Sequence, residues 1–320
     1  MKDTINELNL DKFKLNSINK VWVKIISNSL HRPISAPVTI IKGAKEGPVF
    51  GITAALHGNE VNGIGVIHKF LEKINTKNLH GTIVCVLVAN IPGYLRKTRG
   101  INDRFDLNHL MPGKKNGNTA EVYAYNLFHK IVKKFDFLVD LHTASRGRQN
   151  TLYIRADMSD KKIYKMASLI RPEIILHNPP NDKTLRGIAA KHGIQSVTVE
   201  VGNPSRFQEK YIRKTVIGLK ALLANAGILK TNVSIPKDQK IFRCKSSKWI
   251  YTDDGGILDV TVDLGELIKK GDTIAVLKDI FGDELKVYKS SLDGIIIGKS
   301  VDPIAATGSR IIHLGILDGR

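Results

Sequence analysis

The chain has 320 residues, 42% of them hydrophobic, which is enough to bury a substantial core in one large or two ordinary domains. No stretch approaches the ~18 consecutive apolar residues of a membrane span, and the polar start lacks a signal peptide's apolar core, so we expect no membrane partner and a cytoplasmic location. The formal net charge is +19, but the lysines are scattered and aromatic residues total only 6%, so we expect no specific nucleic-acid partner.

Hydrophobic periodicity predicts strands and helices that alternate through the first two thirds of the chain. A long stretch rich in Gly, Pro and Asn, residues 90–118, is expected to be a functional loop. The expected strands are 21–26, 38–41, 49–56, 82–89, 135–141, 151–155, 173–176 and 195–201, and the expected helices are 61–74, 119–134, 160–170, 183–191 and 205–225.

Near Gly227 the pattern changes, and from Ile241 onward short apolar runs alternate with glycine turns. That spacing is typical of a small all-β module. We therefore predict an α/β fold with a mixed, mostly parallel sheet flanked by helices, followed by a small all-β C-terminal domain. The change in composition places the boundary between about 227 and 240, which gives a catalytic domain over residues 1–235 and a β domain over residues 236–320.

Two strand ends carry residues of the types that bind metal. His57 and Glu60 directly follow the apolar run 49–56, and His142 ends the apolar run that precedes it. Such runs are typical of buried parallel strands, and open α/β sheets place their ligands at the carboxyl ends of these strands. Two imidazoles and one carboxylate form a donor set of catalytic zinc. We predict that His57, Glu60 and His142 bind one Zn²⁺ per chain, against the alternative of unrelated strand-end histidines.

Glu200 is a second candidate catalytic carboxylate. It ends the apolar run Val197-Thr198-Val199, where burial of a charge is costly unless the charge has a partner or a function. A zinc hydrolase needs a base that takes a proton from water and returns it to the leaving group. The alternative is a solvent-facing glutamate on an edge strand.

In their joint order, several motifs resemble the succinylglutamate desuccinylase and aspartoacylase family of zinc carboxypeptidase-like metallohydrolases. The similarity covers most of the chain and extends to the C-terminal β module. The motifs are His57-Gly58-Asn59-Glu60, Asn90-Ile91-Pro92, Arg99, Asp106-Leu107-Asn108, Met111-Pro112-Gly113, Asp140-Leu141-His142 and Thr198-Val199-Glu200-Val201-Gly202.

The resemblance implies that the three proposed ligands bind zinc, that Glu200 is the general base and acid, and that Arg99 polarises the scissile carbonyl. A fixed guanidinium beside the metal would stabilise the developing oxyanion. Arg96 and Arg104 share the loop with Arg99 and remain alternatives for that role.

The chain departs from the family pattern at His109, where the family has an arginine that grips a substrate carboxylate. Histidine cannot form the planar bidentate contact of arginine, although a protonated ring could offer one charge-assisted hydrogen bond. Other arginines could compensate for this loss. The candidate substrate-binding residues are Asn108, His109, Arg146, Arg148 and Arg186.

We therefore predict a zinc-dependent amidohydrolase, a deacylase that cleaves the carbon–nitrogen (non-peptide) bond of an N-acyl amino acid or a related small molecule. One alternative is a carboxypeptidase that acts on small peptides or peptidoglycan fragments. Another is a non-catalytic zinc-containing binding protein, which the substitution at His109 motivates. Whether the chain forms a homo-oligomer is left open.

Overall fold

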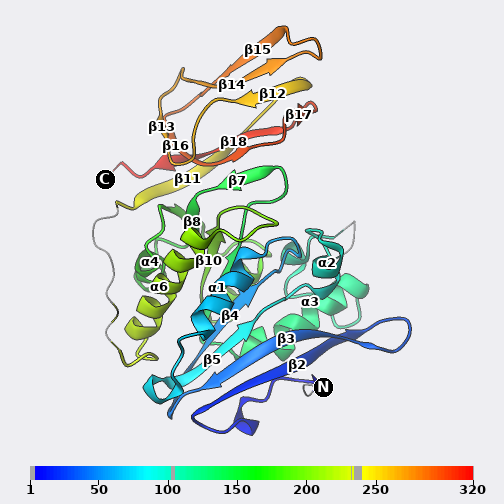
Figure 1. Cartoon of the computed structure of the whole chain (residues 1–320), viewed down its shortest axis with the longest axis vertical. Helices are drawn as coiled ribbons and strands as arrows, with labels where there is room; N and C mark the ends of the chain where they lie inside the picture. Colours follow the sequence, from blue (N-terminus) through cyan, green and yellow to red (C-terminus); the bar gives the residue numbers. More distant parts are fainter. Residues whose placement is uncertain (1–3, 102–104, 232, 234–239, 320) are drawn as a thin grey trace.

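A computed structural model, which describes residues 4–101, 105–231, 233 and 240–319, folds the chain around one large mixed β-sheet (Figure 1). The strands before residue 231 are β1 Thr4–Ile5, β2 Ser17–Ser27, β3 Pro33–Lys42, β4 Lys45–Ala54, β5 His80–Val86, β6 Phe137–His142, β7 Arg148–Asn150, β8 Leu152–Ala156, β9 Ile174–His177 and β10 Gln195–Val201. The helices are α1 Asn62–Leu71, α2 Ile91–Arg96, α3 Thr119–Lys130, α4 Lys161–Leu169, α5 Leu185–Lys191 and α6 Glu209–Asn225.

The centre of this sheet is parallel. Strands β5, β4, β6 and β10 lie side by side in that order and run in the same direction. Because carboxyl ends of parallel strands meet at one sheet edge, the loop after β4 and the ends of β6 and β10 come together. The register pairs Glu200 of β10 directly with His142 of β6.

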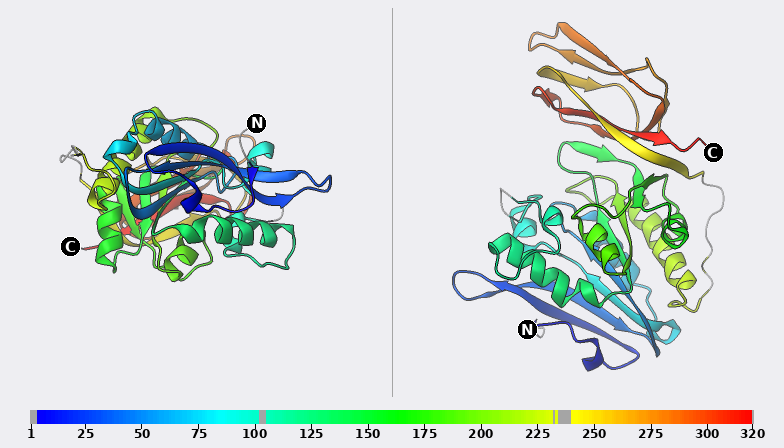
Figure 2. Two further views of the ribbon diagram at one scale, coloured as in Figure 1. Left: turned by 90° about the horizontal axis from the view of Figure 1, so that it is seen from below. Right: turned by 180° about the vertical axis from the view of Figure 1, so that it is seen from behind.

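Helices cover both faces of the sheet, as its two-sided apolar strands require. Helices α1, α4 and α6 pack on one face, where Val139 and Leu141 of β6 point. Helices α3 and α5 pack on the other face of the sheet (Figure 2). Their buried residues share a core cluster with Leu138 of β6. The predicted fold class, a mixed α/β sheet flanked by helices with an all-β region after it, is confirmed.

The C-terminal region is all-β in its described part and lies at one end of the long axis (Figure 1). A second sheet has the order β15-β14-β12-β17. The strands are β11 Phe242–Tyr251, β12 Gly256–Val260, β13 Leu267–Ile268, β14 Thr273–Lys278, β15 Glu284–Lys289, β16 Gly294–Ser300, β17 Ile304–Ala305 and β18 Arg310–Leu317.

The two regions share a sheet. β11 pairs with β9 in parallel at residues 242–244 and with β18 along most of its length. β7 adds a second junction, because it pairs with β16. The predicted boundary at residues 235/236 lies outside the described residues, and the division into two domains stays a prediction.

The expected strands and helices are all present; strand 195–201 has the expected bounds, and the others are shifted by a few residues at one or both ends. The expected loop 90–118 contains α2 and a 3₁₀ helix at Leu107–Leu110, and β7 occupies part of the segment that follows His142. The edge hairpin of β2 and β3 is longer than its apolar core suggests, since polar residues continue both strands. Among the described helices, none has the length and apolar character to cross a bilayer.

Candidate active site

His57, Glu60 and His142 converge on one point at the carboxyl edge of the sheet. Their potential ligand atoms all lie within 4.8 Å of one another, and all three side chains are buried. The Nδ1 atoms of His57 and His142 are 3.1 Å apart. Glu60 Oε1 lies 2.8 Å from Nδ1 of His57, and Oε2 lies 3.0 Å from Nδ1 of His142.

Carboxylates hold the outer nitrogen of each imidazole. Nε2 of His142 lies 2.8 Å from Asp140 Oδ2, and Nε2 of His57 lies 3.0 Å from Asp106 Oδ1. Asp140 in turn accepts a hydrogen bond from the Thr53 hydroxyl at 2.6 Å. An Nε2–H that donates to a carboxylate leaves Nδ1 as a lone pair, so both lone pairs point at the same place as Glu60. This donor set suits a divalent cation.

The electrostatics agree with that reading. Burial alone would raise the pKa of the Glu60 carboxyl, but His57 and His142 hold it well below its ordinary value. Burial would lower the pKa of the His142 imidazole, but Asp140 and then Glu60 raise it well above its ordinary value. Without a cation, the His142 imidazole therefore retains a proton beside the ionised carboxylate of Glu60. A metal ion would replace that proton.

Strand alternation explains why these side chains share one face. Residues Val139 and Leu141 of β6 point into the α1/α6 side of the core, so Asp140 and His142 point to the opposite face. In β10, Val199 and Val201 likewise enter the core, which leaves Glu200 beside His142.

The turn that carries His57 packs closely against helix α2. A Cβ on Gly58 would lie 2.0 Å from the carbonyl carbon of Gly93, so α2 can pack against this turn only if residue 58 is glycine. Asn90 caps α2 by accepting from the Gly93 N–H. Helix α2, inside the expected loop, thus supports the first ligand.

Arg99 lies at the rim of the donor group and is held by four contacts. Its Nη1 donates to Glu60 Oε1 at 2.9 Å and to Ser145 Oγ at 2.7 Å. Its Nε and Nη2 each lie 2.9 Å from Asp106 Oδ2. A guanidinium has five N–H groups, so these contacts, taken over the residues that the structure describes, leave one N–H, on Nη2, for another oxygen. Of the alternatives, Arg96 donates to Ile101 O, and Arg104 lies outside the described residues.

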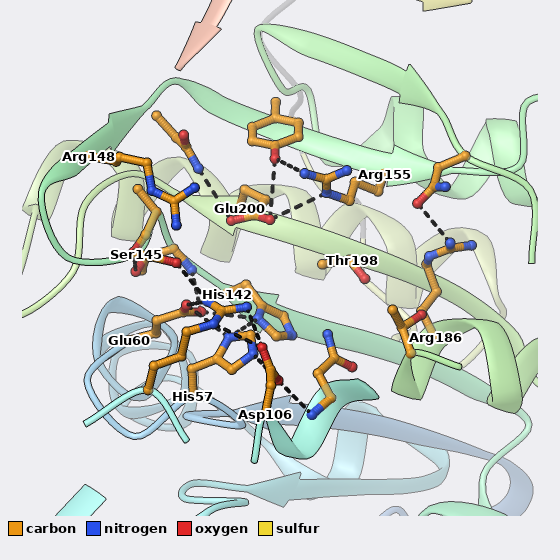
Figure 3. A pocket seen from close by; sticks show the side chains of 18 of the residues that line it. His57, Glu60, Asp106, His142, Ser145, Arg148, Arg155, Arg186, Thr198 and Glu200 are labelled. Atoms are coloured by element: carbon orange, nitrogen blue, oxygen red, sulfur yellow. Dashed lines mark hydrogen bonds and ion pairs between the residues drawn. The ribbon is translucent and has the colours of Figure 1, made fainter. Parts of the chain in front are cut away.

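Glu200 faces the same cavity from the neighbouring strand, as Figure 3 shows. It is 9% exposed and accepts from Tyr153 OH at 3.3 Å and from Asn150 Nδ2 at 3.4 Å. Arg155 Nε lies 3.5 Å from Oε1 and its Nη2 donates to Tyr153 OH at 2.6 Å. β10 lies between β6 and β8, so the alternative of an edge-strand glutamate is wrong.

The cavity has a volume of about 420 Å³ and receives most of the predicted substrate-binding residues. Asn108 lines it, but its Oδ1 already accepts from the Leu185 N–H at 2.8 Å. The His109 side chain is 65% exposed and lies 4.0 Å from Asp106. Arg186 is 2% exposed and donates to Asn178 Oδ1 at 2.9 Å. Arg148 points into the cavity near Ser145 and Glu200 (Figure 3).

Arg146 is placed elsewhere. It is exposed and lines a shallower hollow of about 400 Å³ instead of the cavity with the donor group. The roles of all these substrate-binding candidates remain predictions.

Several cavity residues escaped the sequence reasoning. Tyr153 and Arg155 stand two apart on β8, so alternation could have placed both on the face of Glu200 once the pairing of β8 and β10 was known. Trp249 of β11 and Arg310 of β18 also line the cavity, and only the junction of the two regions brings them there. Ser145 carried no signal in the sequence.

Comparison with known proteins bears on the class of this site. The model of the succinylglutamate desuccinylase/aspartoacylase catalytic domain matches residues 46–226, more than half of the chain. An α/β sheet with a His-Glu-His group at its carboxyl edge is therefore the catalytic domain of a hydrolase. The chain belongs to the succinylglutamate desuccinylase/aspartoacylase family.

Individual relatives span nearly the whole chain. N-alpha-acetyl-L-2,4-diaminobutyric acid deacetylase of Halomonas elongata is 23% identical over 315 residues, which cover 93% of this chain and 92% of the relative. The product-bound ectoine utilization protein EutE (DoeB) of Ruegeria pomeroyi has a TM-score of 0.84 at 18% identity, with coverages of 95% and 97%. A succinylglutamate desuccinylase/aspartoacylase of Rhodobacter sphaeroides has a TM-score of 0.82 at 17% identity, with coverages of 95% and 98%. These structures share the fold from end to end, including the β region.

Proposed function

We propose that the protein is a zinc-dependent deacylase that hydrolyses the amide bond of an N-acyl amino acid. The observation that carries the proposal is the convergence of His57, Glu60 and His142 in one cavity with the carboxylate of Glu200. Membership of the family and the relationship to a deacetylase support the same reaction class.

His57, Glu60 and His142 would hold the zinc ion. When bound, zinc lowers the pKa of a coordinated water and polarises a carbonyl group. Asp140 and Asp106 fix the tautomers of the two imidazoles through their Nε2 atoms, which keeps the Nδ1 lone pairs directed inward.

Glu200 would take the proton from the attacking water and deliver it to the leaving amine nitrogen. Tyr153, Asn150 and Arg155 hold the carboxylate by long contacts of 3.3–3.5 Å, which orient it without closing off its oxygen atoms. A carboxylate in this position can act as base in the first half of the reaction and as acid in the second.

Arg99 would stabilise the oxyanion that develops on the acyl carbonyl. Its contacts to Glu60, Ser145 and Asp106 fix the guanidinium before substrate arrives, and the remaining N–H on Nη2 is available to an oxygen. A preorganised donor beside developing charge typically contributes ~10²–10³ in rate.

Arg186 is our candidate for the substrate's α-carboxylate. Arg186 is buried and lines the cavity. It would supply, from another position, the positive charge that the family's arginine provides at the position of His109. The name of the Halomonas relative makes N-α-acetyl-L-2,4-diaminobutyrate the first substrate to test, with N-acetyl and N-succinyl amino acids beside it.

The test of this mechanism is Glu200→Gln, which keeps shape and polarity but removes the base. We expect kcat to fall by ~10²–10⁴ while the zinc content stays that of the wild type. Glu209→Gln, on the exposed start of α6, is the matched control and should keep wild-type turnover.

Two results would contradict the mechanism. One is full turnover in Glu200→Gln on a substrate that the wild type accepts. The other is a zinc-loaded wild type that hydrolyses none of a broad panel of acyl-amino acids, which would leave the binding-protein alternative.

A further inference from the structure

Two arginines meet at one indole in the outer part of the active-site cavity. The guanidinium carbon of Arg310 lies 4.7 Å from the ring centroid of Trp249, and that of Arg148 lies 5.3 Å from it. Trp249 is itself fixed from behind, because it stacks on the buried ring of His313 at 4.5 Å with an interplanar angle of 6°. The indole is therefore a rigid platform for both cations.

These two arginines differ from the other cavity arginines in their pairing. Arg99, Arg155 and Arg186 each lie within ion-pair distance of a carboxylate of the cavity wall. In the part of the chain that the structure describes, neither Arg148 nor Arg310 has a carboxylate within 4.0 Å.

The proximity of the two guanidinium groups affects the pKa of Arg148. Burial, and then the positive charge of Arg310, lower the pKa of the Arg148 guanidinium to about 10. Glu200 and Glu60 offset part of this effect from a greater distance. The two neighbouring cations still repel each other, and an anion bound between them would relieve that repulsion.

The pair stands where two hollows meet. Arg148 and Arg310 line the 420 Å³ cavity that holds the donor group, and they also line the adjoining 400 Å³ hollow. Asp302 lies in the outer hollow, where its Oδ1 accepts from the Ile304 N–H at 3.2 Å. A molecule that extends from the donor group toward the outer hollow would pass the two guanidinium groups.

We propose that Arg148 and Arg310, held on Trp249, form an anion subsite that receives a second carboxylate of the substrate, remote from the amide that is cleaved. The inference rests on the proposed function, because it assumes an acyl-amino acid in this cavity. It implies a substrate with two anionic groups, one at Arg186 and one at this subsite, and therefore favours the N-succinyl amino acids of the substrate panel over N-α-acetyl-L-2,4-diaminobutyrate, which has a single carboxylate. Guanidinium groups suit a carboxylate because they offer paired planar N–H donors.

The subsite also gives the C-terminal region a part in recognition. Arg148 belongs to β7, whereas Trp249 and Arg310 belong to β11 and β18. The pairing of β7 with β16 brings Arg148 to the other two residues.

Binding of unreactive dicarboxylates tests the subsite without turnover. For the zinc-loaded wild type, the affinities of succinate, glutarate and adipate are compared by calorimetry with those of butyrate, pentanoate and hexanoate. We expect at least one dicarboxylate to bind about 10- to 100-fold more tightly than the monocarboxylate of equal length, as a charge-assisted contact supplies. The double variant Arg148→Met/Arg310→Met should lose that preference.

Arg32→Met is the control for each single variant, since Arg32 is exposed in the turn between β2 and β3 and its loss removes one positive charge, as each single change in the subsite does. It should keep the preference. If the double variant does not fold, Arg310→Met alone removes an exposed residue and should reduce the preference, while Arg310→Lys should keep part of it.

A wild type without any preference for dicarboxylates, or a double variant that retains it, would overturn the subsite. The binding results for the subsite can be told apart from the results that test the deacylase function. A wild type that prefers dicarboxylates yet hydrolyses no acyl-amino acid would refute the deacylase and leave the anion subsite standing.

Discussion

At the scale of single residues, the site depends on which nitrogen of each histidine faces inward. Nδ1 of both rings points to the common centre, and Nε2 of both rings contacts an aspartate. Asp140 is fully buried and has a second contact, to Thr53 on the neighbouring strand. Its carboxylate therefore orients His142 without being a ligand itself.

Asp140→Asn tests this orienting role. The amide is isosteric and can still accept from Thr53, but it no longer offers a full negative charge to the His142 ring. We expect zinc affinity to fall by about 10- to 100-fold with little change in the fold. Competition with a chelator measures the affinity, and Asp259→Asn, on the exposed face of β12, is the matched control. An unchanged zinc affinity in Asp140→Asn would show that Asp140 contributes to the fold and not to metal binding.

The three proposed ligands could be predicted from the sequence because His142 ends one apolar run and His57 and Glu60 follow another, and apolar runs reveal strands. Glu200 could be predicted for the same reason. Trp249 and Arg310 could not, because no local pattern says which face of the β region meets the cavity. His109 was a recognisable departure, but its exposure depends on the path of the segment that carries it.

At the scale of elements, the parallel strands are buried on both faces, and this burial disfavours ionisation of the cysteine thiols that they carry. Cys85 of β5 and Cys244 of β11 are both fully buried and free. Burial raises the pKa of each thiol to about 12. Each thiol therefore keeps its proton in the folded chain at pH values where the unfolded chain has lost it.

Two consequences follow from the raised pKa of these thiols, one for labelling and one for stability. At pH 8 a thiol reagent should label the native protein far more slowly than protein unfolded in guanidinium, since the buried thiols of the native protein stay protonated whereas part of the unfolded thiols is ionised. The pKa of each thiol in the folded chain lies above its ordinary value of 9.0, so its contribution to stability is complete below about pH 9 and is lost as pH rises toward 12. Rapid labelling of the native protein would contradict the burial of these strands.

Elements inside the stretch 90–118 were less predictable than the strands. Its Gly, Pro and Asn content indicates turns, yet α2 begins there with Asn90 as its cap and proline in its first turn. Such a short helix is stabilised by packing on the turn at Gly58. It is too short for its apolar residues to show a helical period in the sequence.

At the scale of the whole molecule, one sheet runs from the N-terminal hairpin into the C-terminal region. β11 covers the edge of β9 and places Trp249 at the cavity. The change of pattern near residue 227 predicted the β region, but not the continuous sheet, because strand pairing between distant segments leaves no local trace.

A chain that ends at Lys230 tests the dependence of the first region on the second. Without β11, the backbone of β9 is an open edge that can pair with other chains. We expect this truncated protein to aggregate on size-exclusion chromatography, whereas full-length Trp249→Ala stays soluble. A soluble truncated chain with wild-type zinc affinity would show that the first region folds and binds metal independently.

The central claim is that His57, Glu60 and His142 hold one zinc ion, and elemental analysis tests it most directly. The wild-type protein, the triple variant with alanine at these positions, and a His129→Ala control are dialysed against equal free zinc and measured by mass spectrometry. We predict about one zinc per chain in the wild type and the control, and none above background in the triple variant. Equal zinc content in all three proteins would contradict the account.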